Sequence, residues 1–245
     1  ITWSSIEQII KPDTLSEASV LLNESGSVIF AGGSYLVSQK DDEVHTLIDI
    51  NHLIDDKIGT SGGDLQIDAG CTLQQILSFC KEDLSQVILA SCPSKNIRNQ
   101  RTIGGEIARS RLDSDLLVFL FAAGTKLILS HSETPIELLA WDGKGIIIKI
   151  ILPNHNVKLE RVALLDSAPA YIIVGYNDMP DVISVCVGGK IANIIFYQSK
   201  PEPQEDEVRK FLDEVEVAFS DDHLGSSAYK RHVVGTLLQE MAGAR

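Results

Sequence analysis

The first 153 residues alternate between short β-branched, apolar runs and segments with helical spacing. The runs predict strands directly before Gly32 and over 46–50, 126–130 and 145–152, with a hairpin over 57–69. Two capping boxes, T-x-x-E at residue 14 and T-x-x-Q at residue 72, predict the starts of short helices. The segment 116–123 is apolar on every side, which predicts a helix that is buried or covered by a partner. This pattern indicates mixed α and β structure.

The pattern changes after Pro153. Residues 154–160 are polar, and we place a domain boundary there. Strands are then predicted over 171–175, 182–187 and 191–198, joined by turns as in an antiparallel meander. Apolar residues recur at helical spacing over 208–219 and 229–241, so two amphipathic helices are expected to pack on these strands.

The net charge and the placement of the cysteines argue against several classes of function. The net charge of -13 argues against binding to nucleic acid or an anionic membrane, because neutralising phosphates needs clustered Lys and Arg. No apolar run is long enough to span a bilayer, and we expect a cytoplasmic protein. The four cysteines and six histidines are scattered, so no metal site is predicted. No G-x-S-x-G motif is present either, and we assign no catalytic acid, base or nucleophile.

Two glycine turns are the candidate binding elements. Gly32-Gly33-Ser34 follows a strand directly, and Thr102-Ile103-Gly104-Gly105 precedes the buried helix. Glycines let backbone N–H groups approach a ligand closely, although each turn taken alone is equally well an ordinary surface turn. The first turn is not G-x-G-x-x-G, because it lacks a third glycine and no helical pattern follows it. A Rossmann dinucleotide site is therefore disfavoured.

The contexts of the two turns resemble the flavin-binding medium subunit of the molybdenum hydroxylases, the family of xanthine dehydrogenase and carbon monoxide dehydrogenase. AGGSYL at 31–36 resembles the family's A-G-G-T-D-L turn, and IRNQRTIGGEIARSRLDSD at 97–115 resembles its I-R-N-x-G-T-I-G-G-N block with the following Asp. The opening IIKPDTLSEASVLL and the late SSAYKRHVVGTLL also match, so the resemblance covers nearly the whole chain.

The resemblance implies an α+β fold. It consists of a two-subdomain FAD-binding fold of the vanillyl-alcohol-oxidase type and a C-terminal domain of three antiparallel strands and helices. The implied domains are FAD-binding subdomain 1 (1–55), FAD-binding subdomain 2 (56–153) and the C-terminal flavoprotein domain (154–245).

The resemblance also implies a set of FAD contacts. The first turn would hold the pyrophosphate, the second would form the opposite wall, and an aspartate would accept from ribityl or ribose hydroxyls. A strand residue would lie against the isoalloxazine, and an arginine would approach the polar edge of the flavin. In this order the residues are Ile29, Phe30, Ala31, Gly32, Gly33, Ser34, Tyr35 and Leu36; Thr102, Ile103, Gly104 and Gly105; Asp115; Ile148; and Arg161.

The function implied by the resemblance is electron transfer within a molybdopterin-dependent hydroxylase or dehydrogenase. A molybdopterin-binding large subunit would oxidise the substrate, and [2Fe-2S] clusters on a small subunit would pass electrons to FAD on this chain. FAD would then reduce an external acceptor such as NAD or oxygen. Two alternatives stay open: a structural or assembly subunit without flavin turnover, and a stand-alone FAD-dependent NAD(P)H reductase.

Several positions depart from the family pattern. Tyr35 replaces an Asp, Arg101 replaces a Gly, Glu106 replaces an Asn and Leu112 replaces a Pro. Arg101 and Glu106 place one charge of each sign beside the predicted pyrophosphate site. A Glu106 side chain pointing into the site would weaken FAD binding, whereas pairing with Arg101 or Arg98 would largely remove that cost.

Overall fold

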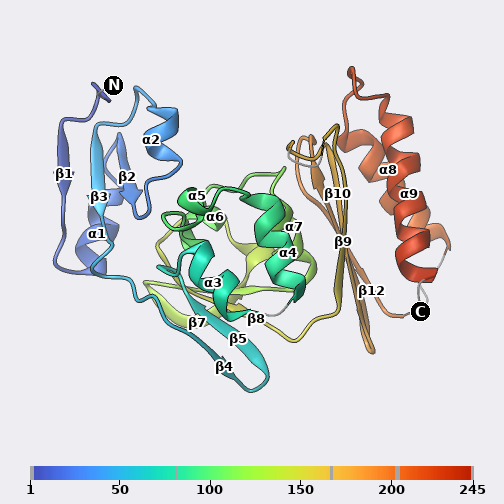
Figure 1. Ribbon diagram of the computed structural model, residues 1–245, viewed down its shortest axis with the longest axis horizontal. Coiled ribbons are helices and arrows are strands. Elements are labelled where there is room, and N and C mark those ends of the chain that lie inside the picture. The colour runs from blue at the N-terminus through green and yellow to red at the C-terminus, as the bar shows by residue number, and fades with distance from the viewer. Residues whose placement is uncertain (1–2, 81, 166–167, 202–204, 244–245) are drawn as a thin grey trace. The chain divides into compact units, whose positions relative to one another are not determined.

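A computed structural model describes residues 3–80, 82–165, 168–201 and 205–243 (Figure 1). The chain divides into two compact units, each assembled from three stretches of sequence. The first unit comprises Ile1–Cys80, Ser94–Arg109 and Lys126–Leu152, and the second comprises Lys81–Pro93, Ser110–Thr125 and Pro153–Arg245. The three-domain division at residues 55 and 153 stays a prediction.

A small parallel sheet opens the first unit. Its strand order is β1 (Gln8–Ile10), β3 (Thr46–Asp49), β2 (Ser27–Phe30). Helix α1 (Leu15–Leu22) follows β1, and the single helical turn α2 (Leu36–Gln39) follows β2. Parallel strands joined through helices agree with the mixed α and β structure predicted for this region. The expectation that no helix follows the first glycine turn was wrong, because a helix of four residues is too short to show a 3.6-residue period.

A five-stranded antiparallel sheet forms the rest of the first unit. Its order is β4 (Ile58–Ser61), β5 (Asp64–Asp68), β8 (Ile147–Leu152), β6 (Lys126–Leu129), β7 (Ser132–Glu137). The helical elements of this part are α3 (Leu73–Phe79), α5 (Lys95–Arg98), α6 (Ile103–Ala108) and the 3-10 turn η1 (Leu138–Ala140). The hairpin of β4 and β5 and the capping box of α3 confirm two predictions.

Backbone hydrogen bonds join the start of α3 to the start of α6. Leu73 N–H donates to the Arg101 carbonyl over 2.9 Å, and Ile103 N–H donates to the Cys71 carbonyl over 2.9 Å. Thr72 and Thr102 form an isolated antiparallel bridge between the two segments. The polypeptide before α6 is therefore held on the end of the β5 segment, which fixes the second glycine turn.

The second unit is built on an antiparallel sheet of order β12 (Ile195–Ser199), β11 (Val182–Gly189), β10 (Ile172–Met179), β9 (Val157–Val162). Helices α8 (Glu205–Ala218) and α9 (Ser227–Gly243) lie along one face (Figure 1). Alternate residues of β10, such as Ile172, Val174 and Tyr176, pack with these helices in one hydrophobic cluster.

Helix α7 (Asp115–Ala122) packs against the opposite face of this sheet, at two glycines. A Cβ atom added at Gly175 would lie 2.9 Å from Ala122 Cβ, and one added at Gly188 would collide with Val118. Helix α4 (Glu82–Ser91) also packs on α7. Apart from Phe121, all residues of α7 are buried, as its uniformly apolar sequence predicted.

The structure confirms the mixed α and β class and adds elements to the prediction. Strand β9 adds a fourth strand to the three predicted for the meander; its sequence VKLERV alternates apolar and charged residues at the sheet edge, and we had interpreted it as part of a polar boundary. The last predicted strand, 191–198, occupies Ile195–Ser199. Helix α4 had not been predicted.

Candidate functional site

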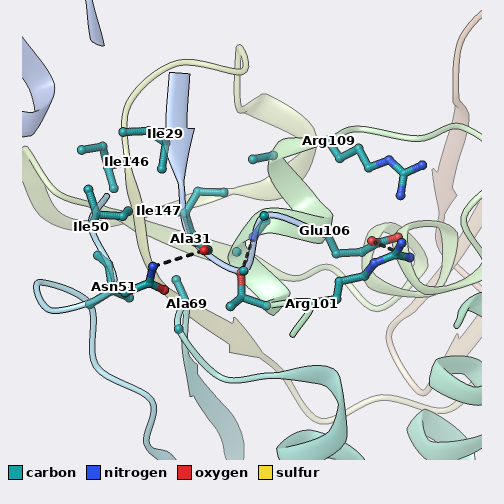
Figure 2. A pocket seen from close by; sticks show the side chains of 18 of the residues that line it. Ile29, Ala31, Ile50, Asn51, Ala69, Arg101, Glu106, Arg109, Ile146 and Ile147 are labelled. Atoms are coloured by element: carbon teal, nitrogen blue, oxygen red, sulfur yellow. Dashed lines mark hydrogen bonds and ion pairs between the residues drawn. The ribbon is translucent and has the colours of Figure 1, made fainter. Parts of the chain in front are cut away.

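The first unit contains a cavity of about 850 Å³, which is within the range of roughly 300–1,000 Å³ of small-molecule and cofactor sites. Its walls come mainly from four parts of the sequence: the turn after β2, the segment after β3, the start of α6, and the segment before β8. Leu22, Ala69 and Gly70 also line it. Figure 2 shows side chains from these parts around one space. The two glycine turns, which lie about seventy residues apart in sequence, thus line one cavity.

The turn after β2 lines the cavity with unused backbone donors. Within the described residues, the N–H groups of Gly32, Gly33, Ser34 and Tyr35 donate to no protein acceptor. Gly33 has a left-handed backbone with φ +64°, and Tyr35 is right-handed, with φ -89° and ψ -55°. Successive N–H groups in a turn that mixes left- and right-handed residues form a concavity that binds anions. This turn therefore fits a phosphate group.

Close packing explains why both positions of this turn are occupied by glycine. A Cβ atom on Gly32 would collide with the Gln100 carbonyl, so only glycine allows the turn to approach the segment before α6. A Cβ atom on Gly33 would lie 2.5 Å from the Phe30 ring, and the positive φ already disfavours a side chain there. The Asn51 Nδ2 group donates to the Ala31 carbonyl over 3.2 Å, which ties the turn to the end of β3.

The amides of the second turn, in contrast, bond to the protein itself. Ile103 N–H donates to Cys71, and Gly104 N–H donates to the Ala69 carbonyl over 3.0 Å. Gly105 N–H donates over 3.2 Å to the Thr102 hydroxyl, which caps α6. Thr102, Gly104 and Gly105 line the cavity, whereas Ile103 is buried in the core. This turn forms a wall of the cavity, and its amides are not available to a ligand.

Charged side chains lie beside the first turn. The Arg101 Nη1 atom lies 3.4 Å from Glu106 Oε2, and only 2% of the Glu106 side chain is exposed. The Arg101 Nε atom lies 3.5 Å from Ser34 Oγ, and the Arg109 guanidinium stacks 3.9 Å above the centroid of the Tyr35 ring. Figure 2 shows the Arg101 and Glu106 side chains pointing toward each other, joined by a dashed line. Glu106 therefore pairs with Arg101, which is the arrangement expected to preserve anion binding.

Five predicted residues are not among those that line the cavity; Ile103, which is buried in the core, is one of them. Phe30 packs behind Gly33, and Ile148 lies in β8, while the adjacent Ile146 and Ile147 line the cavity instead. Asp115 and Arg161 both belong to the second unit.

Asp115 and Arg161 form a partly buried ion pair with each other, in which Asp115 is the buried partner. The Arg161 Nε atom donates to Asp115 Oδ1 over 3.1 Å, and its Nη2 atom donates to the Ala168 carbonyl over 2.8 Å. Burial raises the pKa of the Asp115 carboxyl, and the nearby Arg161 charge opposes that rise. The Asp115 carboxylate is also in the first turn of α7, where the helix dipole favours a negative charge. Their predicted contact with flavin stays a prediction.

Sequence reasoning missed several residues that line the cavity. They come from the loop after β3, the positions directly after β5 and α6, and the segment 141–147, and they include Ile50, Asn51, Asp55, Asp56, Ala69, Arg109, Trp141, Ile146 and Ile147. Asn51 directly follows a predicted strand, a position where polar side chains often face a ligand, and that signal was available. Trp141 and Arg109 carry no comparable signal in their local sequence.

The described residues offer neither a cluster of metal ligands nor a membrane-spanning helix. They contain no group of three His, Cys, Asp or Glu side chains placed to hold a metal ion. No helix in the same residues is long and apolar enough to cross a membrane.

Comparisons with known proteins identify the family. Residues 4–142 match the family described as "FAD binding domain in molybdopterin dehydrogenase". The protein YgfM of Escherichia coli K12 is 29% identical over 248 residues, which cover 96% of this chain and 95% of YgfM. The chain belongs to the family of FAD-binding domains of molybdopterin dehydrogenases, and FAD is the cofactor of that family.

Solved structures show the same fold over almost the full length. Carbon monoxide dehydrogenase from Hydrogenophaga pseudoflava matches with a TM-score of 0.71 at 16% identity, covering 96% of this chain and 95% of that one. Quinoline 2-oxidoreductase from Pseudomonas putida 86 matches with a TM-score of 0.72 at 16% identity, covering 95% and 94%. These likenesses show the fold of the chain, including the residues after 142.

The residues of the cavity fit FAD. The volume suits a large cofactor, and the glycines at 32 and 33 leave space that a Cβ atom would fill. The row of unused N–H groups suits a diphosphate, and Arg101, Arg109 and Glu106 together carry a net charge of +1 beside it. Isoleucines at 29, 50, 146 and 147 supply apolar surface for a ring system.

Proposed function

We propose that this chain is the FAD-binding electron-transfer subunit of a molybdopterin-dependent hydroxylase or dehydrogenase. The observation that carries the proposal is the row of unused amides at Gly32–Tyr35 along a cavity of cofactor size. Bound FAD would supply the redox chemistry, because its isoalloxazine ring can accept electrons one at a time and release them singly or in pairs.

The chain's own part in this function is binding and orientation. The Gly32–Tyr35 amides would hold the diphosphate, and Asn51 keeps that turn in place through its bond to Ala31. The isoleucines of the cavity exclude water from a bound ring. Electron transfer through a bound flavin requires no proton to be held by a dedicated side chain, so we assign no catalytic acid or base.

Partner subunits complete the proposal. Electrons would arrive from [2Fe-2S] clusters on a small subunit, after substrate oxidation at a molybdopterin cofactor on a large subunit. They would leave to an external acceptor such as NAD or oxygen. Family membership supports this assignment, as does the fold shared with carbon monoxide dehydrogenase and quinoline 2-oxidoreductase.

The proposal is tested by purifying the chain together with co-expressed large and small subunits. We expect one FAD per chain in the absorption spectrum, and bleaching of that flavin when substrate is added without oxygen. Stoichiometric FAD that substrate never reduces would favour the assembly subunit. Steady NADPH oxidation by the isolated chain would favour the stand-alone reductase. A colourless complex that takes up no FAD in titration would contradict the proposal.

A further inference from the structure

Arg101 is held beside the first glycine turn by its backbone. Its N–H donates to the Ile97 carbonyl over 2.8 Å, and its carbonyl accepts from Leu73 N–H over 2.9 Å. Gly32 packs directly on the neighbouring Gln100 carbonyl. The Arg101 side chain therefore starts from a fixed point next to the unused amides.

The Arg101 side chain is also restrained. Its Nη1 atom pairs with Glu106, and its Nε atom lies 3.5 Å from the hydroxyl of Ser34, in the same turn as the unused amides. Glu106 is itself fixed, because its N–H donates to the Thr102 carbonyl within α6. A nearly buried carboxylate is costly without a cation, so the ion pair keeps the guanidinium at the cavity before any ligand binds.

We propose that Arg101 is a side-chain recognition element for the diphosphate of the cofactor, and that Glu106 positions its guanidinium. The inference rests on the proposed FAD site and adds a charged donor to its backbone amides. Within the described residues, the Arg101 side chain uses one of its five N–H donors, on Ser34, while its Nη1 atom forms an ion pair with Glu106 without a hydrogen bond to Oε2. The remaining donors suit phosphate oxygens, which guanidinium groups bind in fork geometry.

A purely structural role for Arg101 makes a different prediction. If Arg101 only neutralises Glu106, removing both charges together should leave nucleotide binding unchanged. If Arg101 contacts the diphosphate, the double variant should still lose affinity for ligands that carry phosphates. Both alternatives predict that Arg101→Gln alone is harmful, because it leaves the Glu106 carboxylate without this cation beside the anion site.

The experiment measures binding of FAD, ADP and riboflavin to the full-length apoprotein. Of the two tryptophans, Trp141 lines the cavity, so a Trp3→Phe background leaves Trp141 fluorescence as the reporter. The variants are Arg101→Gln, Glu106→Gln and the double variant. The charge-matched control is Arg209→Gln, which changes an exposed arginine of α8. Thermal unfolding checks that each variant is folded.

We expect the double variant to bind FAD and ADP about tenfold or more weakly, as loss of a charge-assisted hydrogen bond predicts. Riboflavin, which lacks phosphate, should bind all variants alike. Glu106→Gln should bind ADP less tightly than the unaltered chain, because the guanidinium loses the partner that positions it. Equal or tighter ADP binding by Glu106→Gln would overturn the positioning role of Glu106. The affinity for ADP should also depend less on salt in the double variant.

Recovery of full ADP affinity in the double variant would overturn the inference, and so would an equal loss for riboflavin. Normal FAD uptake by the unaltered chain and by both Arg101 variants would overturn the inference about Arg101 and leave the proposed function unaffected. Failure of the unaltered chain to bind any of the three ligands would overturn the proposed function with it.

Discussion

The two glycine turns of the cavity look alike in sequence and differ in whether their backbone N–H groups donate hydrogen bonds to the protein. The amides of Gly32–Tyr35 have no acceptor in the described part of the chain, whereas those of Ile103, Gly104 and Gly105 all donate to protein oxygens. The first turn keeps its hydrogen-bonding capacity for a ligand. The second uses it to fasten α6 to the segments that end at Ala69 and Cys71.

The two glycine pairs therefore have different structural roles. In the first turn, glycine permits a left-handed residue and keeps side chains out of the cavity. In the second, Gly104 permits close packing: a Cβ atom there would lie 2.8 Å from Ala69 Cβ. A Gly-Gly pair is thus a binding element only where the surrounding fold leaves its N–H groups unused.

The largest expected effect is from Gly33→Val in the first turn. The side chain would strike Phe30 and force a β-branched residue to φ +64°, which disrupts the row of amides. We expect FAD affinity to fall by about 100-fold, measured by flavin fluorescence titration.

The control for this variant is Gly59→Ala in β4, where an added Cβ atom meets nothing within 4 Å. Its FAD affinity should match that of the unaltered chain. A Gly33→Val chain that binds FAD as tightly as this control would remove the first turn from the site.

A smaller effect, on stability, is expected from Gly104→Ala in the second turn. Overpacking against Ala69 should lower the free energy of unfolding of the apoprotein by about 1–3 kcal/mol, measured by urea denaturation. FAD affinity of the folded protein should change by less than about threefold, because this turn donates no amide to the ligand.

Ala69→Gly offers a matched test, because it removes the Cβ atom that Gly104→Ala would meet. The double variant should recover part of the lost stability. If Gly104→Ala instead weakened FAD binding as strongly as Gly33→Val does, the contrast between the turns would be wrong.

The smallest expected effect is a difference in stability between variants that lack the hydroxyl group of Thr102 and variants that lack that of Ser34. Thr102→Ala removes the cap of α6 and should cost about 0.5–2 kcal/mol of unfolding free energy, whereas Thr102→Ser should retain most of it. Ser34→Ala should leave the stability of the apoprotein unchanged within about 0.5 kcal/mol, because Ser34 caps no helix. Equal losses of stability from Thr102→Ala and Ser34→Ala in thermal unfolding would contradict the separate roles of the two turns.

Sequence patterns predicted the parts of the fold whose periodicity is strong. The uniformly apolar α7, the hairpin of β4 and β5, and both capping residues, Thr14 and Thr72, were all identified from residue type and spacing. Strand β9 was not, because an edge strand with Lys158, Glu160 and Arg161 is as polar as a loop.

The site was predicted only in part, for a reason that lies in tertiary structure. The residue types at 31–34 and 102–105 pointed to glycine turns, and both line the cavity. Local sequence does not show that the amides of Gly104 and Ile103 are taken by Ala69 and Cys71, because those acceptors lie some thirty residues away. The same holds for Arg109 and Tyr35, whose stacking is a tertiary contact.

Hydrogen–deuterium exchange with and without FAD tests the central claim most directly, through peptides that cover residues 29–37 and 101–108. In the apoprotein, we predict fast exchange for the amides of Gly32–Tyr35 and slow exchange for those of Ile103–Glu106, which are already hydrogen-bonded. FAD should slow exchange strongly in the first peptide and change the second little. Slow exchange of the first peptide without ligand, or no change there at saturating FAD, would contradict the account.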